Sequence, residues 1–341
     1  MKIMKLDRPP EKILIVKPSS LGDVVHSLPF LNAIRACFPK AEVHWVIAKG
    51  LSGLLEGHPM INRLVAINKD SWKKISTMRE TIKEIGRLFM ELRNERYDMV
   101  IDLQGLFRSG VITMLTQAPF RIGFAEAREG SRFFYNFKIR AGKDLHAVDR
   151  YMKIAEALGC GVAETLFTFA LVNDTERISR ITKPLGRYAV IVPGARWDTK
   201  IWPAERFGRL ASMLPLKSIV IGSGADIRIA EKVVEFSRGK AISLAGMTTL
   251  RELMQIMRKA TVVISNDSGP MHIAAAFSVP VAALFGPTSP LRTGPYGRGH
   301  CIIRSATNCS PCFKKRCGDV KCMREITVEM VYEKVRETLS L

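Results

Sequence analysis

The sequence contains no long hydrophobic run. Its 341 residues include no uninterrupted apolar stretch that approaches the roughly 20 residues needed to span a bilayer. The longest candidate, His272 to Gly286, is interrupted by Ser278 and Pro280. The N-terminal segment MKIMKLDRPPEK is charged, and no apolar signal-peptide core follows it. We therefore expect neither a transmembrane helix nor export, and we predict a cytoplasmic protein.

Acidic residues are scarce relative to basic ones. The chain has 32 Asp and Glu against 52 Lys and Arg, which gives a formal net charge of +20. Both halves of the chain are basic, so the excess is not confined to a detachable arm. A positive field raises the local concentration of anions. The charge therefore favours nucleic acids, anionic lipid surfaces or phosphorylated small molecules as partners, without choosing among them.

Cysteine does not suggest a disulfide scaffold. Seven cysteines are an odd number in a large chain without an export signal, which argues against a disulfide framework. The last four form the pattern C-x2-C-x4-C-x4-C within residues 309–322. Four thiolates at this spacing could hold a tetrahedral zinc ion, or they could be reduced thiols that pack a small C-terminal subdomain. Both interpretations stay open on the sequence alone.

Short β-branched runs alternate with segments of helical periodicity along the whole chain. Such runs lie at residues 13–16, 41–48 and 63–67, and the same alternation resumes after residue 186. Strands that alternate with helices predict parallel sheets with right-handed crossovers. The fold class is therefore α/β, with two doubly wound domains.

The two series define the expected domain boundaries. A polar segment separates them, and a helical pattern ends the chain. The final helix could pack back on the N-terminal domain or on the second one, and the sequence does not decide between them. The expected parts are an N-terminal domain over residues 1–171, a linker over 172–186, a C-terminal domain over 187–325 and the final helix over 326–341.

Common nucleotide fingerprints are absent. In open parallel sheets, ligands bind beyond the carboxyl ends of the strands, so the loops there are the candidate sites. None of these loops carries G-x4-G-K-[ST], and GSGADI, residues 222–227, has only two of the three glycines of a dinucleotide site. A P-loop enzyme and a nicotinamide-dependent enzyme are both disfavoured.

The loop SSLGD, residues 19–23, joins the first strand to the first helix. Gly22 allows a tight turn, and the helix N-terminus offers N–H groups to an anion. Asp23 is placed either to cap this helix or to act as a general base that takes a proton from an alcohol. Farther along, Pro29 is expected to kink the helix.

The loop PGARWDTKIWP, residues 193–203, places Arg196 and Lys200 four positions apart after a buried strand. Two cations at a strand end suit a diphosphate, because they neutralise the charge that builds on a departing phosphate. The alternative is a solvated loop that Trp197 and Trp202 anchor. The sequence supports the two interpretations equally.

The segment SNDSGPMHIAAA, residues 265–276, is the strongest local signal. A strand runs into Asn-Asp-Ser-Gly-Pro and then into a helix whose first turn carries His272. Asp267 and Ser268 share that helix N-terminus, where a ligand would meet N–H donors, which favours a functional His272 over a structural one. In the preceding glycine loop, Asp226 could accept hydrogen bonds from a ribose or cap the next helix.

Two basic segments, residues 69–74 and 120–143, are interleaved with aromatic residues. The second holds six Lys or Arg against two Glu. Aromatic side chains that stack on bases suit a nucleic-acid face, whereas the cations also suit phosphorylated lipid headgroups. A solvated charged surface is the third interpretation.

Taken together, these motifs resemble one known family, the ADP-heptose:lipopolysaccharide heptosyltransferases of glycosyltransferase family 9. The resemblance rests on ILIVKPSSLGDVVHSLP, DLQGLFRS, GxxWxxKxWP, SNDSGPMHIAAA and FGPT, which occur in this order over nearly the whole chain. The segments GFAEAREG, FFYNFKI and LHAVDRY look most like heptosyltransferase I. The cysteine-rich CSPCFKKRC segment is similar to a tail found on many family members, so it favours the family over a zinc ribbon.

The resemblance implies a GT-B fold, in which two Rossmann-like domains face each other across a cleft. It also implies an inverting transfer of heptose from ADP-heptose to the Kdo region of lipid A, without a cofactor or a catalytic metal. The enzyme would work at the inner face of the inner membrane, held peripherally on an anionic surface. Nucleic acid is not an expected partner.

Individual roles follow from the positions that match the family motifs. Asp23 matches the proposed general base, and Lys200 matches the lysine on the donor diphosphate. Arg196 stands where some members have a phosphate-binding threonine, and Arg228 stands where some have the glutamate that holds the ribose, so Asp226 is the substitute. Donor-binding residues are then Arg196, Lys200, Asp226, Met247 against the adenine, Asp267, Ser268, Gly269 and His272.

The acceptor side is expected to be basic, because Kdo and phosphate groups are anionic. The residues that the resemblance implies there are Ser20, Gly22, Lys69, Lys73, Lys74, Arg108 and Arg128.

Two alternatives remain beside this assignment. The chain could be heptosyltransferase II or III, or another family 9 enzyme, because donor motifs do not distinguish acceptors. From another class, it could be a basic nucleic-acid-binding protein with a four-cysteine zinc site.

Overall fold

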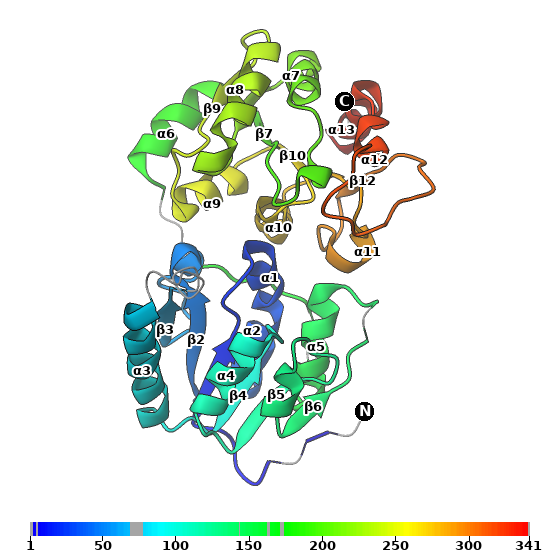
Figure 1. Ribbon diagram of the computed structural model, residues 1–341. Coiled ribbons are helices and arrows are strands. Elements are labelled where there is room, and N and C mark those ends of the chain that lie inside the picture. The colour runs from blue at the N-terminus through cyan, green and yellow to red at the C-terminus, as the bar shows by residue number, and fades with distance from the viewer. Residues whose placement is uncertain are drawn as a thin grey trace. The chain divides into compact units, whose positions relative to one another are not determined.

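The computed structural model describes residues 3, 4, 6–68, 78–142, 144–161, 164–170 and 174–339. The chain divides into two compact units, Met1–Leu171 and Val172–Leu341. Each unit is an α/β structure built around one parallel sheet (Figure 1).

The first unit is a six-stranded parallel sheet in the order β3-β2-β1-β4-β5-β6. Its central strand β1 contains a continuous buried run of Ile, Leu and Val, as expected for a sheet with helices on both faces. Helices α1, α2 and α5 pack together, and α3 packs with α4. The strands are β1 Lys12–Val16, β2 Glu42–Ala48, β3 Arg63–Ile67, β4 Met99–Asp102, β5 Phe120–Phe124 and β6 Phe137–Ile139; the helices are α1 Leu21–His26, α2 Leu28–Cys37, α3 Met78–Asn94, α4 Phe107–Leu115 and α5 Ala147–Ala157.

The second unit repeats this arrangement with the order β12-β11-β10-β7-β8-β9. Helix α7 packs between α8 and α13, while α9 contacts α6 and α10. The strands are β7 Tyr188–Val192, β8 Lys217–Val220, β9 Ala241–Ser243, β10 Val262–Asn266, β11 Val281–Leu284 and β12 Cys301–Ile303; the helices are α6 Glu176–Thr182, α7 Ala204–Met213, α8 Ile227–Phe236, α9 Leu250–Arg258, α10 Gly269–Ala276, α11 Pro290–Thr293, α12 Lys321–Arg324 and α13 Val328–Leu339.

Both strand orders correspond to 3-2-1-4-5-6 of the doubly wound fold. In such a sheet the order reverses between the first and fourth strands, here β1 and β4 in one unit and β7 and β10 in the other. The loops that leave these strands diverge and open a crevice at the carboxyl edge. The expected α/β class, with two parallel sheets, is therefore confirmed.

The first helix is broken where a kink was expected. Helix α1 ends at His26 and α2 begins at Leu28, with Pro29 in its first turn. Proline is tolerated there because the first N–H groups of a helix have no intrahelical partner. The proline therefore begins a second helix instead of bending one.

Both ends of the second unit are folded against its core. Val331 and Val335 of α13 belong to the core of the second unit, where α13 packs against β11, β12 and α7. The expected linker is also partly folded, because α6 buries Ile178 and packs against α9.

The basic aromatic segment 120–143 is mostly part of the first unit's framework. It supplies strands β5 and β6, and Phe124 and Tyr135 are buried. Phe133 is exposed, with Arg132 over its ring. Two of the six aromatic rings of this segment, those of Phe124 and Tyr135, therefore belong to the core and are not available to stack on bases.

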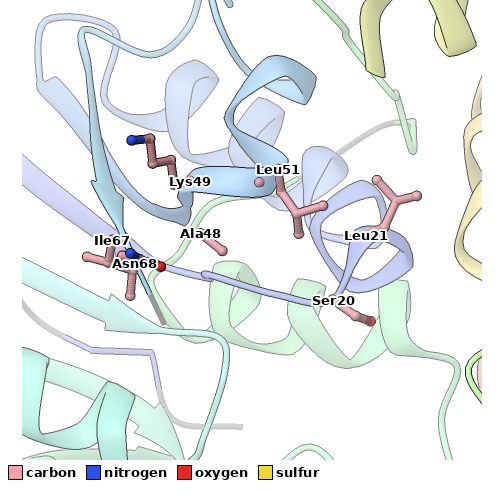
Figure 2. A pocket seen from close by; sticks show the side chains of 8 residues that line it. Ser20, Leu21, Ala48, Lys49, Leu51, Ile67 and Asn68 are labelled. Atoms are coloured by element: carbon pink, nitrogen blue, oxygen red, sulfur yellow. The ribbon is translucent and has the colours of Figure 1, made fainter. Parts of the chain in front are cut away.

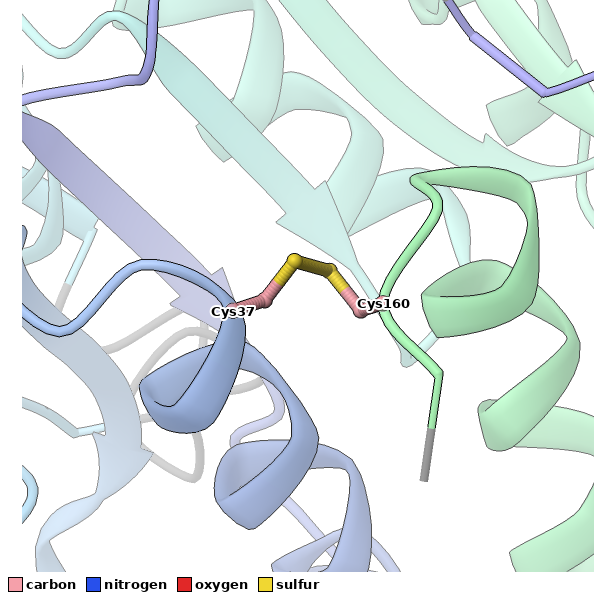
Figure 3. The surroundings of a disulfide bond; sticks show 2 residues. All are labelled: Cys37 and Cys160. Atoms are coloured by element: carbon pink, nitrogen blue, oxygen red, sulfur yellow. A yellow bond between two sulfur atoms is a disulfide. The ribbon is translucent and has the colours of Figure 1, made fainter. Parts of the chain in front are cut away.

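One disulfide bond joins Cys37 at the end of α2 to Cys160 beyond α5 (Figure 3). The sequence argued against a disulfide framework, and for this pair that expectation is wrong. The two Cα atoms lie 5.3 Å apart although 123 positions separate them in sequence. This spacing is within the usual range for a disulfide, and only the packing of α2 against α5 creates it.

No helix within the described ranges is long and apolar enough to cross a membrane. The longest of these helices, α3, has 17 residues. It falls short of the roughly 20 residues of a membrane span. It also carries charges such as Arg87 and Glu91.

Helices α7 and α8 approach closely at one glycine. A Cβ atom added to Gly208 would lie 2.5 Å from Cβ of Phe236 and 2.6 Å from the carbonyl oxygen of Val233. Gly86, an exposed glycine in α3, has no such neighbour within 4 Å. The two helical glycines therefore differ in packing alone.

We expect Gly208→Ala to lower the free energy of unfolding by about 1–3 kcal/mol, because the added methyl group pushes two packed helices apart. Gly86→Ala, the matched control, should raise it by about 0.5–1 kcal/mol through helix propensity. Urea denaturation of both variants measures the difference. Equal effects of the two substitutions would contradict the close approach.

Candidate active site

Polar side chains gather at the point of strand reversal in each unit. In the first unit the loops after β1 and β4 lie side by side, because Val16 pairs with Asp102. In the second unit Val192 at the end of β7 pairs with Ser265 of β10. The motifs that the sequence singled out leave these strands, so the fold places them where ligands of open parallel sheets bind.

Asp23 lies half-buried in the first turn of α1. Its Oδ2 accepts hydrogen bonds from the backbone N–H of Ser20 at 3.0 Å and from the Ser20 hydroxyl at 2.6 Å. These contacts form the capping box of α1. The helix-cap interpretation is therefore supported by direct contacts, and the same contacts fix the carboxylate beside the loop after β1.

The loops after β1 and β4 are bonded to each other. The N–H of Ser19 donates to Oε1 of Gln104 at 3.2 Å, and the Lys17 ammonium donates to the carbonyl of Leu103 at 3.2 Å. The N–H of Gln104 in turn donates to Oδ1 of Asp102 at 2.8 Å. These hydrogen bonds hold the loop that precedes Asp23 against the loop after β4. Lys17 and Gln104 were not predicted from the sequence as residues of the site.

Asp102 is fully buried at the end of β4. Its oxygens also accept hydrogen bonds from the N–H of Gly105 at 3.0 Å and the hydroxyl of Tyr135 at 2.5 Å. Burial raises the pKa of the Asp102 carboxyl, although these donors act against the rise. Burial likewise raises the pKa of the Tyr135 phenol, so Tyr135 stays protonated and donates.

A pocket of about 240 Å³ opens beside the start of α1. Figure 2 shows its lining side chains, which come from the segment that joins β1 to α1 and from the ends of β2 and β3 with the residues that follow them. Leu21 and Leu51 provide apolar walls, while Ser20, Lys49 and Asn68 provide polar groups. Ser20 was expected on the acceptor side; Lys49 and Asn68 follow strands without any motif, and only the sheet order brings them here.

The remaining predicted acceptor residues fall into three groups. Arg108 at the start of α4 and Arg128 after β5 are exposed, and their loops meet because the N–H of Arg128 donates to the carbonyl of Gly105 at 2.9 Å. Gly22 is buried in α1. Lys69, Lys73 and Lys74 lie outside the described residues.

In the second unit an ion pair joins the two predicted motifs. Nζ of Lys200 lies 2.6 Å from Oδ2 of Asp267, with side chains 16% and 6% exposed. The hydroxyl of Thr288 donates to the same oxygen at 2.5 Å. Asp267 therefore holds Lys200 in place at the edge of the sheet.

Two tryptophans lie beside Lys200 in its loop. Trp202 is fully buried against Phe207, and its indole N–H donates to the carbonyl of Ile326 at 2.8 Å. The Trp197 ring lies beneath two ammonium groups, those of Lys200 at 4.6 Å and Lys315 at 5.4 Å from its centre. The loop is thus anchored and also strongly cationic. Arg196 on the same loop is exposed.

Asp226 lies close to the loop after β7. A Cβ atom added to Gly194 would lie 2.3 Å from its Oδ1, so any larger residue there would require the Asp226 side chain to move. Its Oδ2 accepts hydrogen bonds from the N–H of Ser223 at 2.8 Å and from the Ser223 hydroxyl at 2.7 Å. These contacts form a capping box at the short 3₁₀ turn Gly224–Asp226, and Asp226, the N-cap residue of α8, makes no side-chain cap hydrogen bond to that helix.

Helix α10 begins shortly after the end of β10, so its N-terminus lies at the carboxyl edge of the sheet, as does the loop after β7. Ser268 is its N-cap residue, Gly269 its first residue, and His272 is buried in its first turn. The amide of Asn266 donates to the carbonyl of Pro193 at 2.7 Å, which ties β10 to the loop after β7. Met247, after β9, exposes 58% of its surface, and its carbonyl accepts a hydrogen bond from Arg177.

The four clustered cysteines occupy different environments. Cys322 is buried in the core of the second unit, whereas Cys309 and Cys317 are exposed. Within the part of the chain that the structure describes, no group of three or more His, Cys, Asp or Glu is placed to hold a metal ion. The zinc alternative therefore lacks a preformed ligand cluster among these residues.

Comparison with known proteins identifies the class. The family model described as glycosyltransferase family 9 (heptosyltransferase) matches residues 85–322. Lipopolysaccharide heptosyltransferase 1 of Pseudomonas aeruginosa is 32% identical over 90% of this chain and 87% of its own length. Lipopolysaccharide core heptosyltransferase OpsX of Haemophilus influenzae is 29% identical over 84% and 82%.

A solved structure is similar over nearly the whole chain. The Escherichia coli heptosyltransferase WaaC, determined with ADP, has a TM-score of 0.78 at 26% identity, and the match covers 96% of this chain and 99% of that one. The two Rossmann-like units are thus those of a GT-B glycosyltransferase. The protein belongs to glycosyltransferase family 9, which confirms the resemblance and its enzyme class.

We expect Lys200→Met to lower the free energy of unfolding by about 3 kcal/mol, because Asp267 is left buried without its cation. The double variant Lys200→Met/Asp267→Asn should recover most of this loss, since Asn still accepts from Thr288. Lys315→Met, which removes the other ammonium over Trp197, is the control and should change stability by less than about 0.5 kcal/mol. The ion pair would be refuted if the changes in the free energy of unfolding caused by Lys200→Met and by Asp267→Asn simply added up in the double variant.

Proposed function

We propose that the protein is heptosyltransferase I, which moves heptose from ADP-heptose to the Kdo region of lipid A with inversion at the transferred carbon. One observation supports the proposal most strongly. At the point where the strand order reverses, one unit has a carboxylate that could act as a base, and the other has positive charge that could stabilise a leaving phosphate. The first unit offers the Asp23 carboxylate, and the second offers the Lys200 ammonium and the N-terminus of α10. The names of the relatives support heptose as the sugar.

The acceptor half of the reaction needs a base. In the proposed step the Asp23 carboxylate takes the proton of an acceptor hydroxyl, whose oxygen attacks the anomeric carbon of the heptose. The bond from that carbon to the ADP oxygen breaks on the opposite face, so the configuration inverts. General base assistance is typically worth about 10²–10⁴-fold in rate.

The donor half needs charge stabilisation of departing ADP. Lys200 and Arg196 supply positive charge, and the first turn of α10 supplies N–H groups. Fixed cations and dipoles stabilise developing negative charge without reorganising during the reaction. We place the adenine against exposed Met247; Asp226 and His272 complete the donor site, with Ser268 and Gly269 beside the phosphates.

The acceptor is assigned to the pocket at the start of α1. Its apolar walls and hydroxyl, ammonium and amide groups suit one face of a sugar with its polar edge. Lys49 would pair with a carboxylate of the Kdo region, and exposed Arg108 and Arg128 would meet further anionic groups.

Two substitutions separate the two halves. Asp23→Asn keeps a carbonyl oxygen to accept from Ser20, yet it should reduce turnover at least 10²-fold because the amide is no base. ADP affinity of this variant, measured by calorimetry, should stay unchanged. Lys200→Ala should weaken ADP binding. Near-normal turnover of Asp23→Asn, or unchanged ADP affinity of Lys200→Ala, would overturn the assignment.

The acceptor distinguishes heptosyltransferase I from II or III. We expect turnover with ADP-heptose and Kdo2-lipid A, and little with an acceptor that already carries the first heptose. The reverse preference would assign the chain to a later transfer step.

We further propose that the protein binds peripherally to the inner face of the inner membrane, where a lipid A acceptor would be anchored. The net charge of +20 favours an anionic surface. Exposed Phe133, with Arg132 over its ring, joins an apolar and a cationic group at one place on the first unit.

Flotation with liposomes tests this association. Binding to vesicles that contain anionic lipid should be strong at low salt and lost at about 0.5 M salt, because the Debye length shrinks with ionic strength. Arg132→Gln/Phe133→Ser should weaken flotation and leave ADP affinity unchanged. Absence of binding at low salt would remove the proposal.

A further inference from the structure

The cysteine-rich loop, residues 309–322, has no part in the reaction described so far. Its middle part, residues 314–316, has the sequence KKR, and all three residues are exposed. The cysteines beside it form no preformed metal-ligand cluster within the described ranges. Three adjacent positive charges repel one another, so an anion close to them would be favourable. The surroundings of this cationic loop therefore decide what it can bind.

Two hydrogen bonds hold the cysteine-rich loop against the donor side of the second unit. The hydroxyl of Thr199 donates to the carbonyl of Lys314 at 3.0 Å, across 115 positions of sequence. The N–H of Phe313 donates to the carbonyl of Pro287 at 2.7 Å. Because Thr199 directly precedes Lys200, the loop is fixed beside the ion pair in which Lys200 takes part.

Lys315 of this loop lies over the same aromatic ring as Lys200. The ammonium nitrogen of Lys315 is 5.4 Å from the centre of the Trp197 ring, and that of Lys200 is 4.6 Å from it. The separation of the two nitrogens therefore cannot exceed the sum of these distances. The ring attracts both cations, which offsets part of their mutual repulsion. Two ammonium groups held this close suit a ligand with more than one negative charge.

The two ammonium groups differ in how far their charge is compensated. Lys200 is paired with Asp267 at 2.6 Å, so much of its charge is already neutralised. Lys315 is exposed, and no carboxylate in the part of the chain that the structure describes forms an ion pair with it. Lys315 therefore supplies the uncompensated positive charge at this place.

We propose that Lys315 is a diphosphate-binding residue of the donor site, and that the cysteine-rich loop is the segment that positions it. The inference rests on the proposed function, in which ADP departs from the site at Lys200. A diphosphate that reaches both ammonium groups gains a charge-assisted contact with each. The attraction of Lys315 is the part that Asp267 does not offset.

Lys315→Met removes the ammonium group and retains an unbranched side chain. We expect ADP and inorganic pyrophosphate, measured by calorimetry at low salt, to bind about fivefold more weakly, the upper end of what an exposed ion pair contributes. The difference from wild type should shrink at 1 M salt, where the Debye length is about 3 Å. A purely structural role of Lys315 would leave a difference that persists at high salt.

Two matched variants control for charge and for packing. Lys217→Met removes one positive charge from the same unit at the opposite edge of the sheet, where Lys217 begins β8 and donates to the carbonyl of Gly239 at 2.9 Å. It should leave both affinities unchanged. Lys315→Arg keeps the charge and should bind both ligands nearly as tightly as wild type.

The two ligands separate failure of the inference from failure of the proposed function. If Lys315→Met binds both as tightly as wild type, the inference is overturned and the proposed function stands. Equal losses in Lys315→Met and Lys217→Met also overturn it, because overall charge would then explain the effect. Pyrophosphate binding that depends on Lys315, in a protein that does not bind ADP, supports the diphosphate site and refutes the proposed donor. Absence of binding to either ligand overturns both.

Discussion

The parallel pairing of two central strands in each unit is the constraint on which the candidate site depends. Val16 pairs with Asp102, and Val192 pairs with Ser265. These ladders are buried, so their register is fixed by both hydrogen bonding and packing. A shift of one residue would turn every side chain at the strand end to the other face and would separate the loops that carry the polar groups.

Much of this architecture could be predicted from local patterns. The buried β-branched runs and Gly loops marked the central strands, and motifs with helix-start chemistry marked Asp23 and Ser268. Strands β5 and β6 were missed because their basic and aromatic residues resemble a surface segment, while Phe124 is held in the core by neighbours. The ends of the second unit were equally undecided, because α13 buries Val331 against strands far away in sequence.

The rest of the site depends on long-range contacts that no local pattern encodes. Lys17 reaches Leu103 across 86 positions. Lys49 and Asn68 join one pocket only because β1, β2 and β3 are adjacent in the sheet. The disulfide is a similar case, since Cys37 and Cys160 meet through helix packing. In contrast, Lys200 was predicted from its own motif, although its pairing with Asp267 was not.

In the proposed donor site, the salt bridge between Lys200 and Asp267 would affect how easily the nucleotide is released. An unpaired ammonium would bind a diphosphate most strongly after the sugar has left, when the phosphate charge is greatest. With a carboxylate 2.6 Å away, part of the ammonium charge is already compensated. A diphosphate at Lys200 would therefore be bound less tightly and could dissociate after the reaction. The Lys200 ammonium would then pair again with Asp267 alone.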